Sequence, residues 1–171
     1  ILLRLRGNWL EAVGRAHPGA GGGTPGRANS RRLANAPPAI TDVRHDPPIP
    51  PPGAAVTVWA RADDPDGLSS VMLVYRLDPG MRSYWVPMRS GGGGWYWAAI
   101  PGQSSGMTAA FHLVASDLHA ISATARFPAE APRSECLIRW GDPRDEGPFG
   151  GYHLWITQAT LGRWRQREKQ S

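Results

Sequence analysis

The nine residues Ala54–Ala62 read AAVTVWARA, and the alternation of their side chains decides the fold. Small apolar residues occupy every second position, and polar or larger residues lie between them. The first set is Val56, Val58 and Ala60, and the second is Thr57, Trp59 and Arg61. Successive side chains of a β-strand point to opposite faces, so this stretch is predicted to be a strand with one buried and one solvent-facing side.

Short strands of this kind recur through residues 38–128 and are separated by turn-forming residues. The turns include Asp63–Gly67, Asp78–Gly80 and Pro101–Gly106, and a glycine hinge is expected at Ser90–Gly94. The other six strands are expected at residues 39–43, 71–76, 84–88, 95–100, 107–116 and 121–127. Seven short strands with no helical period between them indicate two antiparallel sheets packed face to face.

Residues 38–128 are therefore predicted to form an all-β domain, a seven-stranded β-sandwich of the immunoglobulin or fibronectin type III kind. The Cys…Trp…Cys pattern of antibody domains is absent, because Cys136 is the one cysteine and has no partner for an internal disulfide. The core must then hold without a disulfide. Its expected members are Val58, Leu73, Tyr75, Trp97, Phe111 and Leu113.

The segments on both sides of this domain differ from it in composition. Residues 1–37 contain the run AGGGTP at Ala20–Pro25 and are predicted to be a disordered linker, or the end of a preceding domain with its linker. In residues 129–171 a further strand is an option at 135–140. Thr157 is predicted to cap a short helix at 158–170. Leu161 and Trp164 alone cannot hold such a helix, so it is expected to pack on something that is not present in these residues, and the chain is expected to be a fragment of a larger protein.

The charge distribution argues against nucleic-acid binding. The formal net charge is +5, but residues 1–36 alone carry +5, residues 37–128 carry −1 and residues 129–171 carry +1. A nucleic-acid binder concentrates positive charge on its folded part, and here the excess lies in the glycine-rich leader. No run of about 18 apolar residues is present, so no membrane span is expected.

Three stretches together resemble bacterial secreted proteins of the CotH family, which includes the spore-coat kinases. Gly23–Gly26 with Ala28–Ser30 is similar to the tail that follows a lamin-tail-type domain. Phe149–Ala159, with Trp164 beyond it, resembles the initial segment of a CotH-type kinase domain. The phrases within the sandwich are similar to an immunoglobulin-like module of those proteins: Asp64–Gly67, Val74–Arg76, Ile100–Gln103 and Ala115–Asp117. The resemblance implies an extracellular or cell-surface protein with its signal sequence upstream. The nucleotide-binding and catalytic residues of the kinase would lie beyond Ser171.

Three weak enzyme or cysteine patterns favour structural interpretations. Gly102–Gly106 fits G-x-S-x-G, with Asp117 and His119 following in hydrolase order, but a strand follows it where a nucleophile elbow needs a helix. The glycine run at 91–94 has no lysine and no strand-to-helix junction, so it is no phosphate loop. Cys136 has no adjacent histidine and is interpreted as a buried or incidental thiol.

Calcium and carbohydrate binding remain open from the residue types, whereas zinc binding is disfavoured. Asp63, Asp64 and Asp66 offer hard oxygen ligands for calcium, although Asp-Pro-Asp-Gly is also ordinary turn chemistry. The spacing of His112 and His119, with Asp117, fits no common zinc pattern. The aromatic residues Trp85, Trp95 and Trp97 would bind a carbohydrate if their rings were exposed on one face.

The functional expectation is a non-catalytic spacer or interaction module that needs no cofactor. Its partners are expected to be neighbouring domains of the same polypeptide, with a cell-surface protein or a polysaccharide as further candidates. The alternatives are a carbohydrate-binding or surface-adhesion module, and the truncated N-terminal part of a CotH-like kinase. Fold alone does not choose among them.

Overall fold

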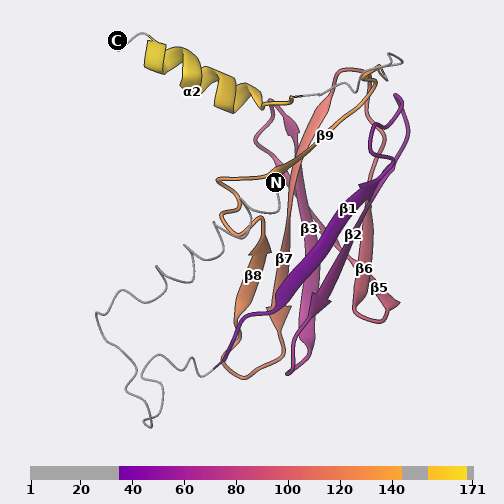
Figure 1. Cartoon of the computed structure of the whole chain (residues 1–171), viewed down its shortest axis with the longest axis vertical. Helices are drawn as coiled ribbons and strands as arrows, with labels where there is room; N and C mark the ends of the chain where they lie inside the picture. Colours follow the sequence, from indigo (N-terminus) through magenta and orange to yellow (C-terminus); the bar gives the residue numbers. More distant parts are fainter. Residues whose placement is uncertain (1–34, 144–153, 169–171) are drawn as a thin grey trace, which may run out of the picture. The chain divides into compact units, whose positions relative to one another are not determined.

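The computed structural model of the chain describes residues 35–143 and 154–168 (Figure 1). These residues form nine strands in two antiparallel sheets, and one short helix, α2 (Gln158–Glu168). The predicted all-β architecture with a short C-terminal helix is thereby confirmed. Within the described residues, no helix is both long enough and apolar enough to span a membrane.

Sheet A contains four strands in the order β1-β2-β6-β5. The strands are β1 (Ala39–Asp46), β2 (Val56–Asp63), β5 (Arg89–Gly92) and β6 (Trp95–Ile100). The alternation in β2 has the predicted effect, since Val56, Val58 and Ala60 are fully buried and Arg61 is exposed. The register of β2 on β6 pairs Trp59 with Trp97, which places both indoles on the outer side of the sheet.

Sheet B contains five strands, four of them in the order β4-β3-β7-β8. The strands are β3 (Leu68–Asp78), β4 (Ser83–Pro87), β7 (Thr108–Asp117), β8 (Thr124–Phe127) and β9 (Cys136–Arg139). β7 also pairs with β9, through residues 108–111, while β8 pairs with residues 113–116. One strand therefore runs the length of sheet B and is flanked on the same side by two short ones.

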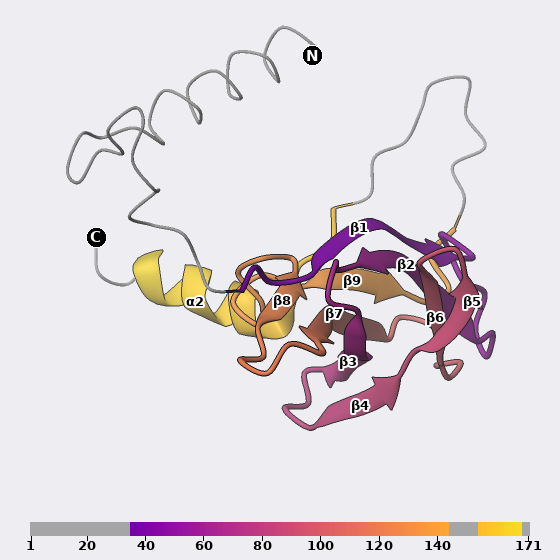
Figure 2. The same cartoon turned by 90° about the horizontal axis from the view of Figure 1, so that it is seen from below.

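The core lies between the two sheets, which Figure 2 shows as two layers. Sheet A contributes Val58 and Ile100, and sheet B contributes Leu73, Phe111 and Leu113, each at most 1% exposed. Burial of such side chains contributes on the order of 1.5–3 kcal/mol each to folding. The core continues past Pro128, because Ile138 and Trp140 are fully buried in it.

Two sequence expectations, the strand count and the place of Trp97, need correction, and the glycine segment is confirmed as a hairpin turn. Each of the seven expected ranges contains a strand, and β9 confirms the further strand considered at 135–140. The strand β5 was not expected, so the described strands number nine rather than seven. Most of the glycine hinge belongs to the β5–β6 hairpin: Gly93 and Gly94 both have positive φ, as a tight two-residue turn requires. Trp97 is not a core residue, because the inward side chains of β6 are Tyr96, Ala98 and Ile100.

The first and last parts of the domain, at Asn35 and Trp140, are hydrogen-bonded at opposite ends of β7. At the C-terminal end of β7, the side-chain amide of Asn35 donates to the carboxylate of Asp117 and to the Ile121 carbonyl. At the other end, the backbone N–H of Trp140 donates to the carbonyl of Met107, the residue before β7 (2.9–3.0 Å is typical; here 3.0 Å). Ten residues of extended strand span about 33 Å, so the two anchors are far apart.

Helix α2 begins at the predicted cap and is held by its first turn. The Thr157 hydroxyl accepts the Thr160 N–H at 3.2 Å, as an N-cap does. The Gln158 N–H donates to Asp78 Oδ2 at 2.9 Å, which joins the helix to the end of β3. Beyond this first turn most of the described helix residues are exposed, Trp164 at 53%, so a packing partner outside this chain stays a prediction.

Candidate functional site

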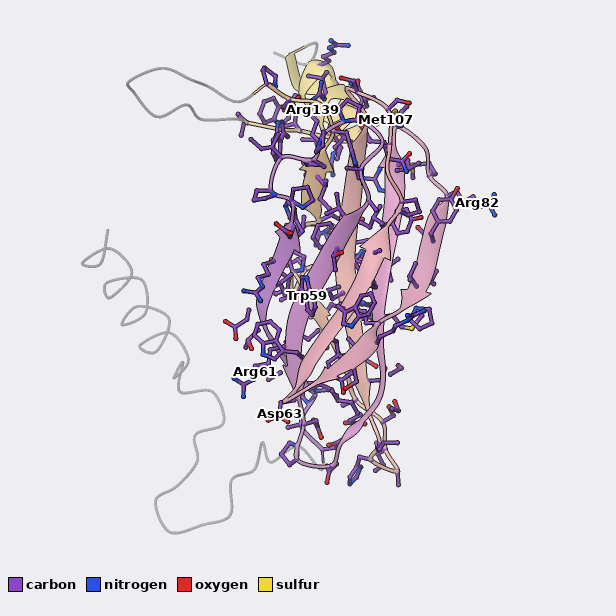
Figure 3. The ribbon with its side chains drawn as sticks, turned by 90° about the vertical axis from the view of Figure 1, so that its right-hand side faces the viewer. Trp59, Arg61, Asp63, Arg82, Met107 and Arg139 are labelled. Atoms are coloured by element: carbon purple, nitrogen blue, oxygen red, sulfur yellow. The ribbon has the colours of Figure 1, made fainter. Side chains whose placement is uncertain are left out.

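The outer side of sheet A carries a cluster of aromatic and basic side chains, here called the Arg–Trp face. Its members are Arg44, Trp59, Arg61, Arg89, Trp95 and Trp97. The strand register aligns four of them directly across the sheet, one from each strand, as Arg44, Trp59, Trp97 and Arg89. Figure 3 labels Trp59, Arg61 and Asp63 at alternate positions along β2.

The rings and guanidinium groups of this face are in contact. The indoles of Trp59 and Trp97 lie 6.0 Å apart between centroids with a tilt of 35°. The Arg89 guanidinium lies 5.4 Å from the Trp97 ring centroid. The Arg44 guanidinium lies 4.9 Å from the Trp95 ring centroid, although β2 separates the two strands. Cation–π contacts at exposed sites stabilise a pair by about 0.5–1 kcal/mol.

The arginines of this face have free hydrogen-bonding capacity. Among the residues that the structure describes, neither Arg44, Arg61 nor Arg89 makes an ion pair, since all ion pairs found there involve Arg76, Arg139 or His112. A guanidinium that lies over a ring can still direct its N–H groups outward in the ring plane. The face can therefore bind anions without first breaking an internal salt bridge.

The structure brings together two of the three tryptophans proposed for sugar binding. Trp95 and Trp97 lie on the outer side of β6, but Trp85 lies on β4 in the other sheet, where it is 59% exposed. Trp59 takes the third place beside them. The alternation in β2 predicts that Trp59 lies on the side away from the core. The sequence does not show which strand pairs with β2, so it does not predict that Trp59 lies beside Trp97.

A second polar cluster lies on the outer side of sheet B. The Arg76 guanidinium donates to Glu135 Oε2 from Nε and Nη2, at 3.1 and 2.8 Å. Arg76 Nη1 also lies 3.5 Å from Asp78 Oδ1. His112 Nδ1 lies 3.5 Å from Glu135 Oε1, which is beyond good hydrogen-bonding distance. These four side chains link β3, β7 and the start of β9.

This cluster borders a pocket of about 690 Å³ whose lining mixes charged and apolar side chains. Arg76, His112 and Glu135 line it from the sheet, and Trp155 and Thr157 line it from the segment before α2. Burial lowers the pKa of His112 below its ordinary value of 6.5, and outweighs Glu135, which acts to raise it. His112 is therefore neutral near pH 7. Sequence reasoning missed this cluster because its members are spread over sixty residues.

Of the three aspartates proposed for calcium, Asp63 ends β2, and Asp64 and Asp66 lie in the β2–β3 loop. Asp64 Oδ1 accepts the Asp66 N–H at 2.8 Å, which is the bond of an Asx turn, whereas Asp63 and Asp66 are exposed. In the described ranges, no three His, Cys, Asp or Glu side chains are grouped so that they could hold a metal ion. Turn formation accounts for these residues, and calcium binding there stays a prediction.

The structure does not bring together the residues of the weak hydrolase and zinc patterns. Ser104 precedes β7, whereas Asp117 and His119 lie at its far end, so a ten-residue strand separates the parts of the hydrolase pattern. His112 points outward from β7, and Asp117 is buried at 1% exposure. Burial would raise the pKa of Asp117, but hydrogen bonds from Asn35, Ala123 and neighbouring groups together lower it. Asp117 is thus an ionised anchor for the start of the domain.

The single thiol has the character of a structural residue. Cys136 is half-buried and packs against the core from β9. Burial and, second, the charge of Glu135 raise the pKa of its thiol, so the reactive thiolate is disfavoured at neutral pH.

Comparison of the sequence with known protein families finds no family that matches, and comparison with curated proteins finds no similar protein.

Proposed function

We propose that this domain is a non-catalytic, immunoglobulin-like spacer and interaction module, which holds the segments before and after it at a set distance. The observation that carries this proposal is the placement of the two anchors. Asn35 bonds to Asp117, the last residue of β7, and Trp140 bonds to Met107, just before the first. A rigid strand of about 33 Å between the two attachment points suits a spacer.

The strand order supports the immunoglobulin-like assignment. In immunoglobulin constant domains one sheet holds strands A, B, E and D, and the other holds C, F and G. Here β1, β2, β6 and β5 stand in the positions of A, B, E and D, and β3, β7 and β8 in those of C, F and G. β4 adds a strand beside β3, and β9 continues the edge that β8 begins.

The attachment of the C-terminal segment supports a stiff connection to whatever follows. Gly141 N–H donates to the Pro50 carbonyl at 2.9 Å, and Trp155 Nε1 donates to Asp142 Oδ2 at 2.7 Å. Gln158 is tied to Asp78 in the same region, since Asp78 pairs with Thr108 at the start of β7. Such bonds restrict the rotation that a free linker would have.

The resemblance noted from the sequence leads us to place this module in an exported bacterial protein of the CotH family. No residue of the chain is proposed as catalytic. Sequencing the gene beyond the codon for Ser171 tests whether the module belongs to a CotH-family protein. A kinase-like region with a lysine and acidic residues for nucleotide and metal supports it, and an unrelated continuation refutes it.

The spacer role is tested by measuring the distance between the two anchors. Spin labels are placed at the exposed positions Ala36 and Pro143 in a full-length Cys136→Ser background, and the distance is measured by double electron–electron resonance. We expect one narrow distribution centred at about 30 Å or more. A broad distribution, like that of a free linker, would refute the role. In an additional Asn35→Ala variant, we expect the distribution to widen.

A further inference from the structure

The Arg–Trp face is not needed for the spacer role, yet it combines features that suit a ligand. It presents three arginines and three tryptophans from all four strands of sheet A. The acidic side chains in the strands of sheet A are Asp42 and Asp46 of β1 and Asp63 at the end of β2, and all three are exposed. Among the described residues, none of these carboxylates forms an ion pair with Arg44, Arg61 or Arg89, so the guanidinium groups stay available to a ligand.

We propose that the Arg–Trp face binds an acidic polysaccharide, one that carries carboxylate groups on some of its sugars. A carboxylate can accept two parallel N–H bonds from a guanidinium, and Arg44 and Arg89 are held over indole rings in advance of binding. Because stacking fixes these side chains, less conformational entropy is lost when the ligand arrives.

The apolar part of the ligand is assigned to Trp59. Among the described residues no guanidinium lies over the Trp59 ring, and its contact with Trp97 is tilted rather than stacked. The flat apolar face of a pyranose ring can pack against such an indole. Trp59 lies between Arg44 and Trp97 in the row across the sheet, so a sugar there would have a guanidinium near it.

The arrangement favours a sparsely charged polymer over nucleic acid. Arg44 and Arg89 lie on the two outer strands of sheet A, three strand spacings or about 14 Å apart. Duplex DNA carries a charge about every 1.7 Å and needs many phosphate contacts. Asp42, Asp46 and Asp63 would repel such a dense polyanion, whereas a sparsely charged polymer can place its carboxylates at the arginines and away from these aspartates.

The test measures binding of the full chain to polygalacturonate at low ionic strength by isothermal titration calorimetry. The double variant Arg44→Gln/Arg89→Gln is expected to lose about tenfold or more in affinity, and Trp59→Ala to weaken binding as well. The matched control is Arg82→Gln, because Arg82 is also stacked on a ring, at 5.2 Å over Tyr84, but lies in the β3–β4 hairpin of sheet B. The control is expected to bind like the parent chain.

Several outcomes would overturn the proposal. They are no binding to polygalacturonate, equal binding to uncharged dextran, or an equal loss in the Arg82→Gln control. Tighter binding to single-stranded DNA, to polyglutamate or to phosphatidylglycerol vesicles would assign the face to another class of partner. Thermal unfolding of each variant is measured alongside. If a double variant does not fold, Arg44→Lys and Arg89→Lys, which keep the charge but lose the planar fork, must each weaken binding for the proposal to stand.

Discussion

The indole Nε1 of Trp140 donates a hydrogen bond of 2.8 Å to the carbonyl oxygen of Ala54. Trp140 is fully buried and comes directly after β9, whereas Ala54 lies in the loop before β2. The bond therefore joins the C-terminal end of the core to the loop between the first two strands. It explains why a residue twelve positions beyond Pro128 is an integral part of the domain.

Replacing Trp140 with alanine is expected to destabilise the chain by about 3–5 kcal/mol, because it removes a large buried ring and leaves the Ala54 carbonyl without its partner. Urea unfolding followed by circular dichroism measures the change. The matched control is Trp85→Ala, since Trp85 is 59% exposed, and its effect should be within about 0.5 kcal/mol. Similar losses in both variants would show that Trp140 is not part of the core.

Gly102 is expected to be required by packing rather than by chemistry. A Cβ atom on Gly102 would lie 2.0 Å from the Gly53 carbonyl oxygen, and backbone atoms cannot move aside cheaply. Gly102→Ala should therefore destabilise the chain by about 1–3 kcal/mol or more, as measured by thermal and urea unfolding.

The control for this variant is Gly162→Ala in α2, where no atom lies within 4 Å of the added methyl group. Alanine favours a helix over glycine, so this variant should be neutral or slightly more stable. If Gly102→Ala had no effect on stability, the packing explanation for the glycine in the G-x-S-x-G pattern would be wrong.

The sequence predicts the strands well because their alternation is local. The apolar residues Val56, Val58 and Ala60 predict a strand with one buried side from only five residues, and β2 forms there. The sequence predicts the wrong side for Trp97 because Trp95, Tyr96 and Trp97 are all aromatic. Neither set of alternate positions is clearly more polar than the other, so this stretch does not show which set is buried. The apolar residues Ala98 and Ile100, which follow at alternate positions, decide the inward side of β6 and continue it from Tyr96.

The candidate sites depend on strand order, which no local pattern contains. Trp59 meets Trp97 because β2 pairs with β6, although the thirty-one residues between these strands (64–94) form β3 and β4 of the other sheet and β5 of this one. For the same reason Trp85, which looks equivalent in the sequence, lies in sheet B. Arg76 and Glu135 meet only after β9 pairs with β7 beside β3.

The Arg76–Glu135 pair is expected to be costly to break. Their side chains are 15% and 11% exposed, so removing Glu135 leaves a buried guanidinium with only Asp78 nearby, at 3.5 Å. Glu135→Ala should lose about 2–4 kcal/mol of unfolding free energy, somewhat below the range for a fully buried pair. The control is the exposed Glu130→Ala, which should change little.

A double variant distinguishes the interaction energy between Arg76 and Glu135 from the separate effects of each side chain on stability. Arg76→Met/Glu135→Met replaces both charges with apolar chains of similar length, so it should be more stable than Glu135→Ala. A double-mutant cycle built on urea unfolding measures the coupling. Additive losses with no coupling would mean that the two side chains do not interact in solution.

Finally, the stability of the chain is expected to fall as the pH is lowered below about 6.5, in part through His112. Burial lowers the pKa of His112 in the folded state, so the unfolded state, with a pKa near 6.5, binds the proton first. The stability that neutral His112 provides is thus complete above the unfolded pKa, and it is lost as the pH falls toward the folded pKa. Each such group changes the unfolding free energy by at most about 1.4 kcal/mol per pH unit.

The measurement is urea unfolding of the chain and of His112→Gln at several values between pH 5 and pH 8. Glutamine keeps a polar side chain of similar reach but does not titrate, so the variant should show a shallower loss of stability below pH 6.5. Because the other histidines are the same in both proteins, the difference between the two curves belongs to His112 and its neighbour Glu135, which lies 3.5 Å away. Parallel curves would mean that His112 has the same pKa in the folded and unfolded states.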